Sequence, residues 1–186
     1  MTFMNGQLWL DQMINHYRRY KTYCEKAVAQ INDKDFFTPV SGNPMSIALL
    51  MKHLAGNNIS RWTDFLTTDG EKETRNRDVE FLLEGETRKQ IYEKWEKGWQ
   101  IMFDEFSKLT EAYLEKTITI RGEPLLVSDA IQRNLAHAAY HAGQIVHLAK
   151  HFAGDKWQTL SIAVGKSEEY NRKMRGKYGN RLGNNR

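Results

Sequence analysis

The chain has 186 residues, of which 40% are hydrophobic, and this is enough for one domain with a substantial core. Its 27 basic and 23 acidic residues give a formal net charge of +4. Residues 167–186 carry six basic and two acidic side chains, so this segment alone accounts for the excess. A nucleic-acid-binding domain usually carries its positive charge on the folded surface, and we therefore expect no nucleic-acid partner.

The sequence favours a cytoplasmic protein. No apolar run approaches the ~20 residues that a membrane-spanning helix needs, so we expect no membrane partner. The first residues lack the basic and apolar regions of a signal peptide. The single cysteine, Cys24, excludes an internal disulfide and suits a reducing compartment. A metal site must then be built from histidine and carboxylate ligands.

The first predicted helix covers residues 6–31, with Asn5 as its N-cap. Its apolar residues recur at steps of three and four, as the core-facing stripe of a bundle helix requires. They are Leu10, Met13, Tyr17, Tyr20, Cys24, Ala27 and Ile31. His16 lies beside this stripe and is interpreted as a surface residue.

The second predicted helix covers residues 46–67 and follows a connection, 32–45, with two prolines. Beside its apolar stripe, the face that bears His53 continues through Asn57 and Arg61. A polar line of this length is either solvent-exposed or the wall of a cleft. Residues 69–86 have no sustained period and are long for a connection, which indicates a functional, crossover or mobile segment.

The third predicted helix begins at Thr87, where Thr87 and Gln90 form a capping box, and ends near Leu109. Its core stripe contains Ile91, Trp95, Trp99 (or Gly98), Met102, Phe106 and Leu109. Residues 117–127 are β-branched around Gly122-Glu123-Pro124, which predicts a hairpin or extended arm. Ser128 and Asp129 are expected to cap a fourth helix that runs to about Phe152.

These elements predict an all-α fold, a four-helix bundle with a long crossover loop at 69–86. A short hairpin or extended arm precedes the fourth helix, and a short C-terminal helix follows it. The expected domain covers residues 1–175, and residues 176–186 are expected to form a basic, flexible tail.

The fourth helix contains two pairs of histidines four residues apart, and such residues are neighbours on one helix face. His137 and His141 share the stripe of Asn134 and Ile145, so we interpret them as a metal-ligand pair. His147 and His151 lie on a wetter stripe near the helix end. A site needs further ligands, and His53 is the best candidate. The alternative is a set of core histidines hydrogen-bonded to their neighbours without a metal.

The chain resembles the DinB/YfiT-like superfamily of metalloenzymes. Three stretches carry the resemblance, and together they cover about residues 5–175. They are His53-Leu54-Ala55-Gly56-Asn57 with residues 60–72 and 75–78, His137-x-x-x-His141-x-Gly143-Gln144-Ile145, and residues 157–162 with 165–171. One departure from the family pattern is Ala163-Val164, where a proline is expected.

The resemblance implies a four-helix bundle that binds one divalent metal through His53, His137 and His141. It also implies a homodimer. Some relatives are transferases that use a low-molecular-weight thiol such as bacillithiol, so the resemblance implies a thiol cosubstrate here.

Three neutral imidazoles leave one position of a metal open, which is typical of a catalytic site, and zinc or nickel is the metal we expect. Bound water would be acidified there and bound thiol deprotonated. Asn57, Asn134 and Gln144 lie near the ligand stripes, where they either orient ligands or substrate or are only helix-surface amides. No carboxylate has a ligand-like spacing beside the histidines. An acidic residue of the 69–86 loop would reach them only if the loop folded over the site.

The expected function is that of a divalent-metal-dependent enzyme acting on a small molecule, specifically an S-transferase for electrophiles. Arg61, with Arg75 and Arg77, would bind the anionic end of the thiol, unless these are solvated loop charges. The sequence leaves two alternatives open, a metal-dependent hydrolase and a non-catalytic, dimeric metal-binding protein of a stress response.

Overall fold

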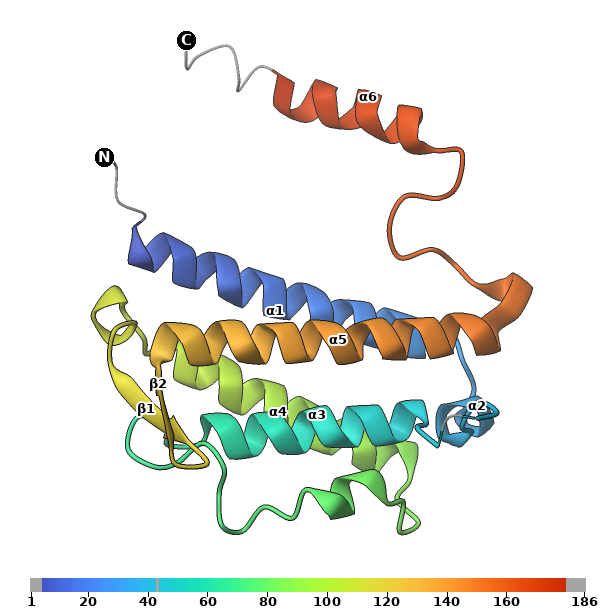
Figure 1. Ribbon diagram of the computed structural model, residues 1–186. Coiled ribbons are helices and arrows are strands. Elements are labelled where there is room, and N and C mark those ends of the chain that lie inside the picture. Colours follow the sequence, from blue (N-terminus) through green and yellow to red (C-terminus); the bar gives the residue numbers. More distant parts are fainter. Residues whose placement is uncertain (1–4, 43, 180–186) are drawn as a thin grey trace.

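The computed structural model describes residues 5–42 and 44–179, and it confirms the predicted all-α class (Figure 1). The helices are α1 (Gly6–Val28), α2 (Asp33–Phe37), α3 (Ile47–Trp62), α4 (Arg88–Ser107), α5 (Val127–Ala153) and α6 (Ser167–Tyr178). Three short 3-10 helices are η1 (Asp78–Phe81), η2 (Glu111–Tyr113) and η3 (Gly154–Lys156). The strands β1 (Thr117–Ile120) and β2 (Glu123–Leu126) form an antiparallel hairpin.

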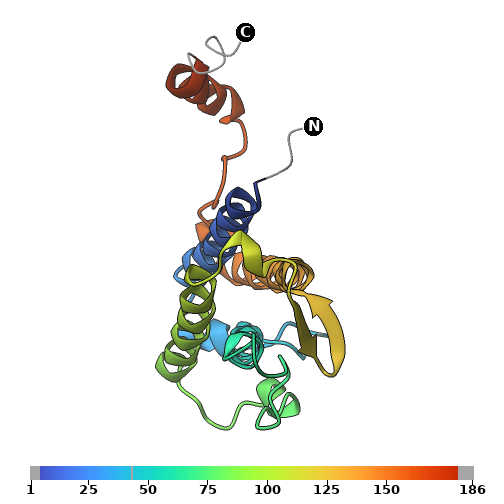
Figure 2. The ribbon, with the colours of Figure 1, turned by 90° about the vertical axis from the view of Figure 1, so that its left-hand side faces the viewer.

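Helices α1, α3, α4 and α5 form the bundle, and Figure 2 views it approximately along the helices. Helices α1 and α5 lie side by side and run in the same direction, while α3 and α4 run in the opposite one (Figure 1). Two consecutive parallel helices need a long return connection. Residues 69–86, which include η1, provide it by carrying the chain back along α3, as the crossover prediction requires.

Three helices begin as the sequence predicts. Asn5 Oδ1 accepts a hydrogen bond from the amide of Leu8 at 3.0 Å, and Ser46 Oγ caps α3 in the same way. At α4, Thr87 and Gln90 form the full capping box. Each cap gives a partner to a backbone N–H that the helix itself leaves unpaired.

The predicted caps of the fourth helix, Ser128 and Asp129, are wrong. Helix α5 begins directly at Val127 after β2, and no side chain caps it. The carbonyl of Lys116 accepts from the amide of Val127 at 2.9 Å, and that of Leu114 accepts from Ser128 at 3.1 Å. The backbone that leads into the hairpin therefore replaces a side-chain cap.

Other boundaries differ from the prediction for local reasons. The connection expected at 32–45 contains helix α2, which Asn32 caps. Helix α3 ends at Trp62 and does not reach 67, because Thr63 is already extended, with ψ of 119°, and Asp64 then adopts a positive φ of 49°. The hairpin turn is formed by Arg121 and Gly122, both with positive φ, and Pro124 belongs to β2. This pair of left-handed residues matches the twist of a two-residue hairpin.

The core is rich in aromatic side chains from α1, α2, α3 and α4. Trp62 lies edge-on to Phe106 with ring centroids 4.6 Å apart, and Trp95 packs in the same way on Trp99 at 5.3 Å. Helices α3 and α4 approach closely at Gly98, where an added Cβ would lie only 2.8 Å from the carbonyl oxygen of Ala55. The predicted stripes of the first and third helices thus face the core.

Asp69 ties the chain after α3 to the hairpin. Its carboxylate accepts hydrogen bonds from the backbone amides of Arg121 and Gly122, both at 2.8 Å. The next residue, Gly70, donates its amide to the carbonyl of Thr119 at 2.8 Å. These contacts fix the hairpin turn against the end of α3, beside the site described below.

Helix α6 stands apart from the bundle in both ribbon views. It crosses the boundary expected at residue 175, and residues 180–186 of the predicted tail lie outside the described part of the chain. Among the described residues, no helix is long and apolar enough to cross a lipid bilayer.

Candidate metal centre

Three histidines from two helices come together inside the bundle. The Nε2 atoms of His53 on α3 and His137 on α5 are 3.2 Å apart, and Nε2 of His141 is 3.1 Å from that of His137. All three ligand atoms lie within 4.8 Å of one another. The four-residue step on α5 places His137 and His141 on one face, which is turned towards His53.

Glu80 orients His53. The carboxylate accepts a hydrogen bond from His53 Nδ1 at 2.8 Å and is itself held by Arg75, whose Nε and Nη2 each donate at 2.8 Å. His53 and Glu80 are 3% and 4% exposed. Because the proton of His53 is on Nδ1, its Nε2 lone pair is directed at the cluster, which is the arrangement that metal-binding histidines show.

Gln144 has the same role for His141. Its Oε1 accepts from His141 Nδ1 at 2.7 Å, and its Nε2 donates to the hydroxyl of Tyr140 at 3.3 Å. This leaves the Nε2 of His141 free of a proton. The structure therefore prepares two of the three imidazoles as acceptors that share a common centre.

The donor set fits a divalent ion. An ion in tetrahedral geometry with bonds of about 2.0–2.1 Å would hold imidazole nitrogens about 3.3–3.4 Å apart. The two short separations, 3.1 and 3.2 Å, are close to this value. Without an ion, a proton on His137 Nε2 can be donated fully to only one of its two neighbours. The hydrogen bonds thus satisfy three clustered lone pairs less completely than a cation would.

Burial keeps His137 and His141 neutral. Burial, together with the nearby His141 and His53, lowers the pKa of His137 to about 3. Burial also lowers the pKa of His141, although the hydrogen bond to Gln144 opposes this. Burial alone would raise the pKa of Glu80, but hydrogen bonds from His53 and Arg75 bring it below its usual value. The site therefore combines two neutral imidazoles, His137 and His141, with an ionised carboxylate, Glu80, behind His53.

A buried amide pair joins α3 to α5 beside the histidines. Asn134 Nδ2 donates to Asn57 Oδ1 at 3.0 Å, and Asn134 Oδ1 accepts from the hydroxyl of Tyr17 at 3.0 Å. The single hydroxyl proton of Tyr17 is shared with the carbonyl oxygen of Ile131, which lies at 2.8 Å. This network orients Asn57 so that its Nδ2 is the group left to donate to a ligand.

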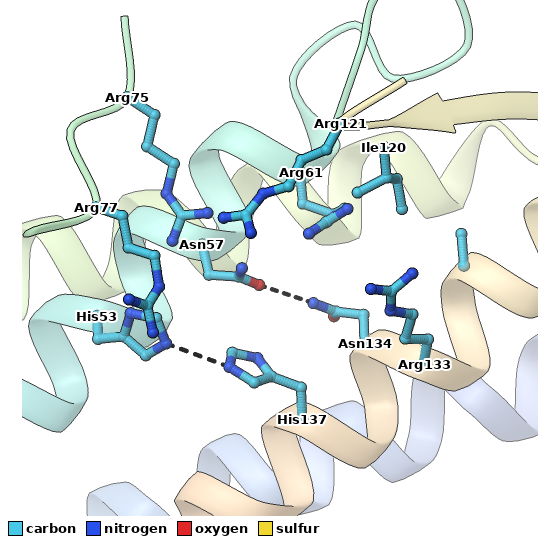
Figure 3. Close-up of a pocket in the computed structure, with 11 residues that line it drawn as sticks. His53, Asn57, Arg61, Arg75, Arg77, Ile120, Arg121, Arg133, Asn134 and His137 are labelled. Carbon is cyan, nitrogen blue, oxygen red and sulfur yellow. Dashed lines mark hydrogen bonds between the residues drawn. The ribbon is translucent and has the colours of Figure 1, made fainter. Parts of the chain in front are cut away.

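A cavity of about 190 Å³ opens beside two of the histidines (Figure 3). Among the described residues, those that line it include five arginines and no carboxylate. They are His53, Asn57, Arg61, Arg75, Arg77, Ile120, Arg121, Ala130, Arg133, Asn134 and His137. The polar line of α3 is thus the wall of a cleft.

The structure brings together most of the residues that the sequence indicated. His53, His137 and His141 form the cluster, and Gln144 contacts His141 away from the cavity. The second pair, His147 and His151, is exposed. Asn57, Arg61, Asn134, Arg75 and Arg77 line the cavity.

Sequence reasoning missed Glu80, Arg121 and Arg133. No carboxylate has a ligand-like spacing to the histidines, because Glu80 reaches His53 from the crossover segment, across 27 positions of the chain. The unusual length of 69–86 was the available signal. Arg121 and Arg133 reach the cavity from the hairpin turn and from a neighbouring turn of α5.

Fold and site together define a four-helix-bundle protein with three histidines clustered between its helices. The family model described as "Protein of unknown function (DUF1572)" matches residues 4–166. The chain therefore belongs to the DUF1572 family. No curated protein and no solved structure matches it.

Proposed function

We propose that this protein is a divalent-metal-dependent enzyme that acts on a small molecule. The observation that carries the proposal is the convergence of three Nε2 atoms at the edge of a cavity, with the Nδ1 atoms of two rings already hydrogen-bonded. Three protein ligands with a neighbouring cavity are typical of a catalytic metal site, in which a fourth position stays open. His53, His137 and His141 would hold the ion, with zinc or nickel as the expected metals.

The ion would supply Lewis acidity, which lowers the pKa of a thiol or water molecule at its open position. Residues of the chain itself would orient the metal ligands and contact the substrate. Glu80 and Gln144 keep the protons of His53 and His141 on Nδ1, and Asn57 offers a donor towards the cavity. Helices and the crossover segment shield the cluster from bulk water, which strengthens electrostatic interactions there.

The specific reaction proposed is transfer of a low-molecular-weight thiol to a small electrophile. The thiol gives its proton to water, its sulfur forms a bond to an electrophilic carbon, and a leaving group such as chloride departs with its bonding electrons. The resemblance to the DinB/YfiT-like superfamily supports this reaction and a homodimeric assembly. The reducing cytoplasm that the sequence indicates would keep such a thiol reduced.

The first arm of the test is metal content. Purified protein should hold about one divalent ion per chain by elemental analysis, since one cluster of this kind is present among the described residues. His137→Ala and His141→Ala should lose the ion. His147→Ala is the matched control, because His147 is an exposed histidine of the same helix. Full occupancy in the first two variants would contradict the ligand assignment.

The second arm measures thioether formation between a panel of biological thiols and a fluorogenic alkyl chloride. Turnover with one thiol, absent in His53→Ala and retained in His147→Ala, would support the transferase. Activity on esters or amides without any thiol would instead support a hydrolase. Full metal occupancy without either activity would support a non-catalytic metal-binding protein.

A further inference from the structure

The arginines of the cavity are unequal in the partners that they already have. Arg75 uses Nε, Nη1 and Nη2 on the carboxylates of Glu80 and Glu71, so its hydrogen-bonding capacity serves the protein itself. The guanidinium of Arg77 already lies over an aromatic ring, 4.8 Å from the ring centre of Phe81. Neither is the best group to hold a ligand.

Arg61 is different. Its Nη1 is buried, and it has no hydrogen-bond acceptor within the part of the chain that the structure describes. The side chain packs against the backbone of Gly70, where an added Cβ would meet Arg61 Cδ and Nη1, each at 3.3 Å. The guanidinium is thus held in place beside the cavity. Leaving a buried cationic donor without an acceptor is costly, and an anion would remove that cost.

Two further arginines face the same space with donors to spare. Arg121 contacts Glu71 through one nitrogen at 3.2 Å, and Arg133 contacts Glu123 through one nitrogen at 2.9 Å. Both contacts are at exposed positions, where ion pairs are weak. In Figure 3 the guanidinium of Arg61 lies between those of Arg121 and Arg133.

The local electrostatics support binding of negative charge. Burial lowers the pKa of Arg61 to about 10. That value already includes the opposing effect of Glu71 and the lowering effect of the charges of Arg133, Arg75 and Arg121. Arg61 is still cationic at neutral pH. A cavity lined by one sign of charge attracts small ions of the opposite sign.

We infer that this cavity binds its ligand through an oxyanion group, a phosphate or a carboxylate, held by Arg61 with Arg121 and Arg133. Guanidinium groups match both oxyanions in geometry, because each can donate two parallel N–H groups. The inference rests on the proposed function, since it gives the charge class of the substrate or cosubstrate for the same site.

The position and size of the cavity narrow the ligand further. In Figure 3, Asn57 and Asn134 lie between the group of Arg61, Arg121 and Arg133 and the two histidines that line the cavity. A ligand held by these arginines therefore directs its other end towards the histidines. A volume of about 190 Å³ is below the roughly 300–1,000 Å³ of pockets for drug-sized ligands, so the anionic head and a few further atoms fill it.

The experiment is a calorimetric titration with inorganic phosphate and, separately, with malonate as the carboxylate probe. Both the metal-free and the zinc-loaded protein are used, at constant ionic strength. Arg61→Met should weaken binding by at least about ten-fold, since hydrogen bonds to charged groups are worth that much. Arg61→Lys should bind more weakly than wild type because the two-pronged geometry is lost. Arg19→Gln is the control, since Arg19 is exposed on α1 away from the cavity.

A stronger response to phosphate or to malonate identifies which oxyanion the site prefers, and both outcomes support the inference. Circular dichroism and zinc content of the Arg61 variants show whether the fold and the histidine cluster persist. Absence of binding by either probe at millimolar concentration would overturn the inference. Zinc-dependent binding that Arg61→Met leaves unchanged would also overturn it, since the anion would then contact only the ion.

The results also separate this inference from the proposed function. Anion binding in a protein that never retains metal would refute the metal-dependent enzyme and leave the arginine site in place. Full metal occupancy without anion binding would refute the arginine site and leave the metal-dependent enzyme in place.

Discussion

Glu80 fills the space that any side chain at Gly56 would need. A Cβ added to Gly56 would lie 2.2 Å from Glu80 Oε1 and 2.7 Å from Cδ. Gly56 follows His53 by one turn of α3, and Glu80 accepts a hydrogen bond from His53 Nδ1. A glycine is therefore required at this position for the carboxylate to reach the histidine.

Gly56→Ala should weaken metal binding by about 10–100-fold, the usual effect of losing a hydrogen-bond partner of a metal ligand. Glu80→Gln should weaken it too, because a neutral amide is a weaker acceptor for the imidazole N–H. Competition with a chelator of known affinity measures both. Glu73→Gln, at an exposed position of the same segment, should bind metal as wild type does. Equal affinity in all four proteins would mean that Glu80 does not support the site.

A second pair of glycines tests the packing of the bundle. Gly98→Ala should lower the free energy of unfolding by about 1–3 kcal/mol, because its Cβ would press on the backbone of Ala55. Gly143→Ala should raise the free energy of unfolding by about 0.5–1 kcal/mol. A Cβ added at Gly143 would have open space around it, with no neighbouring side chain within 4 Å, and alanine favours a helix over glycine. Urea unfolding of the metal-free protein measures both. A stabilising Gly98→Ala would show that α3 and α4 can separate at little cost.

The Asp69 contact predicts a particular acid sensitivity. Burial would raise the pKa of Asp69, but hydrogen bonds from the amides of Glu71, Gly122 and Arg121 hold it well below its usual value. The unfolded chain has a pKa of about 3.9 here. The contribution of Asp69 to stability is therefore complete above that pH and is lost as the pH falls towards the folded pKa.

Asp69→Asn should thus be less stable than wild type at pH 6, with the difference shrinking below about pH 4. Thermal unfolding followed from pH 6 to pH 3 measures it. Asp155→Asn changes an exposed aspartate of η3, beyond the end of α5, and should follow the wild-type curve. A constant difference between Asp69→Asn and wild type at every pH would rule out titration of Asp69 as its source.

We predict a symmetric homodimer. Helix α6 has only 12 residues and lies apart from the bundle, and an isolated helix of this length is marginal in water. A second copy would supply the missing packing. Light scattering at tens of micromolar protein should give about twice the chain mass of 21.7 kDa. A monomer mass at that concentration would contradict the prediction.

Removal of residues from Gly176 onward should leave folding and metal content unchanged. This segment lacks apolar periodicity, and its described part lies at the end of α6, far along the chain from the three histidines. Circular dichroism and elemental analysis of the truncated protein provide the check. Loss of folded protein would show that this segment supports the bundle.

The predictions from the sequence were most accurate for features that depend on residue spacing within a single helix. The Trp95 to Phe106 stripe of α4, the Thr87 capping box and the pairing of His137 with His141 all depend on helical spacing, and each is visible in a short window. The polar line from His53 to Arg61 is also visible in the sequence, where it indicates either solvent exposure or the wall of a cleft. The structure shows that it is the wall of a cleft.

The sequence could not give contacts that depend on how distant segments meet. Glu80 and Arg121 reach the site from irregular segments whose paths are set by packing. The start of α5 depends on the carbonyls of Leu114 and Lys116, so a search for capping side chains gave Ser128 and Asp129 instead. Short helices such as α2 have too few residues for a periodic signal.

The three histidines lie across the junction between two halves of the molecule. One half is formed by α1 and α5, and the other by α3 and α4. The two helices of each half pack more extensively on each other than on the helices of the other half. His53 belongs to one half, and His137 with His141 to the other. An ion held by all three would act as a reversible cross-link between these halves, and it would stabilise the folded state in proportion to the logarithm of free metal concentration. The melting temperature of the protein would then report how much metal its surroundings offer.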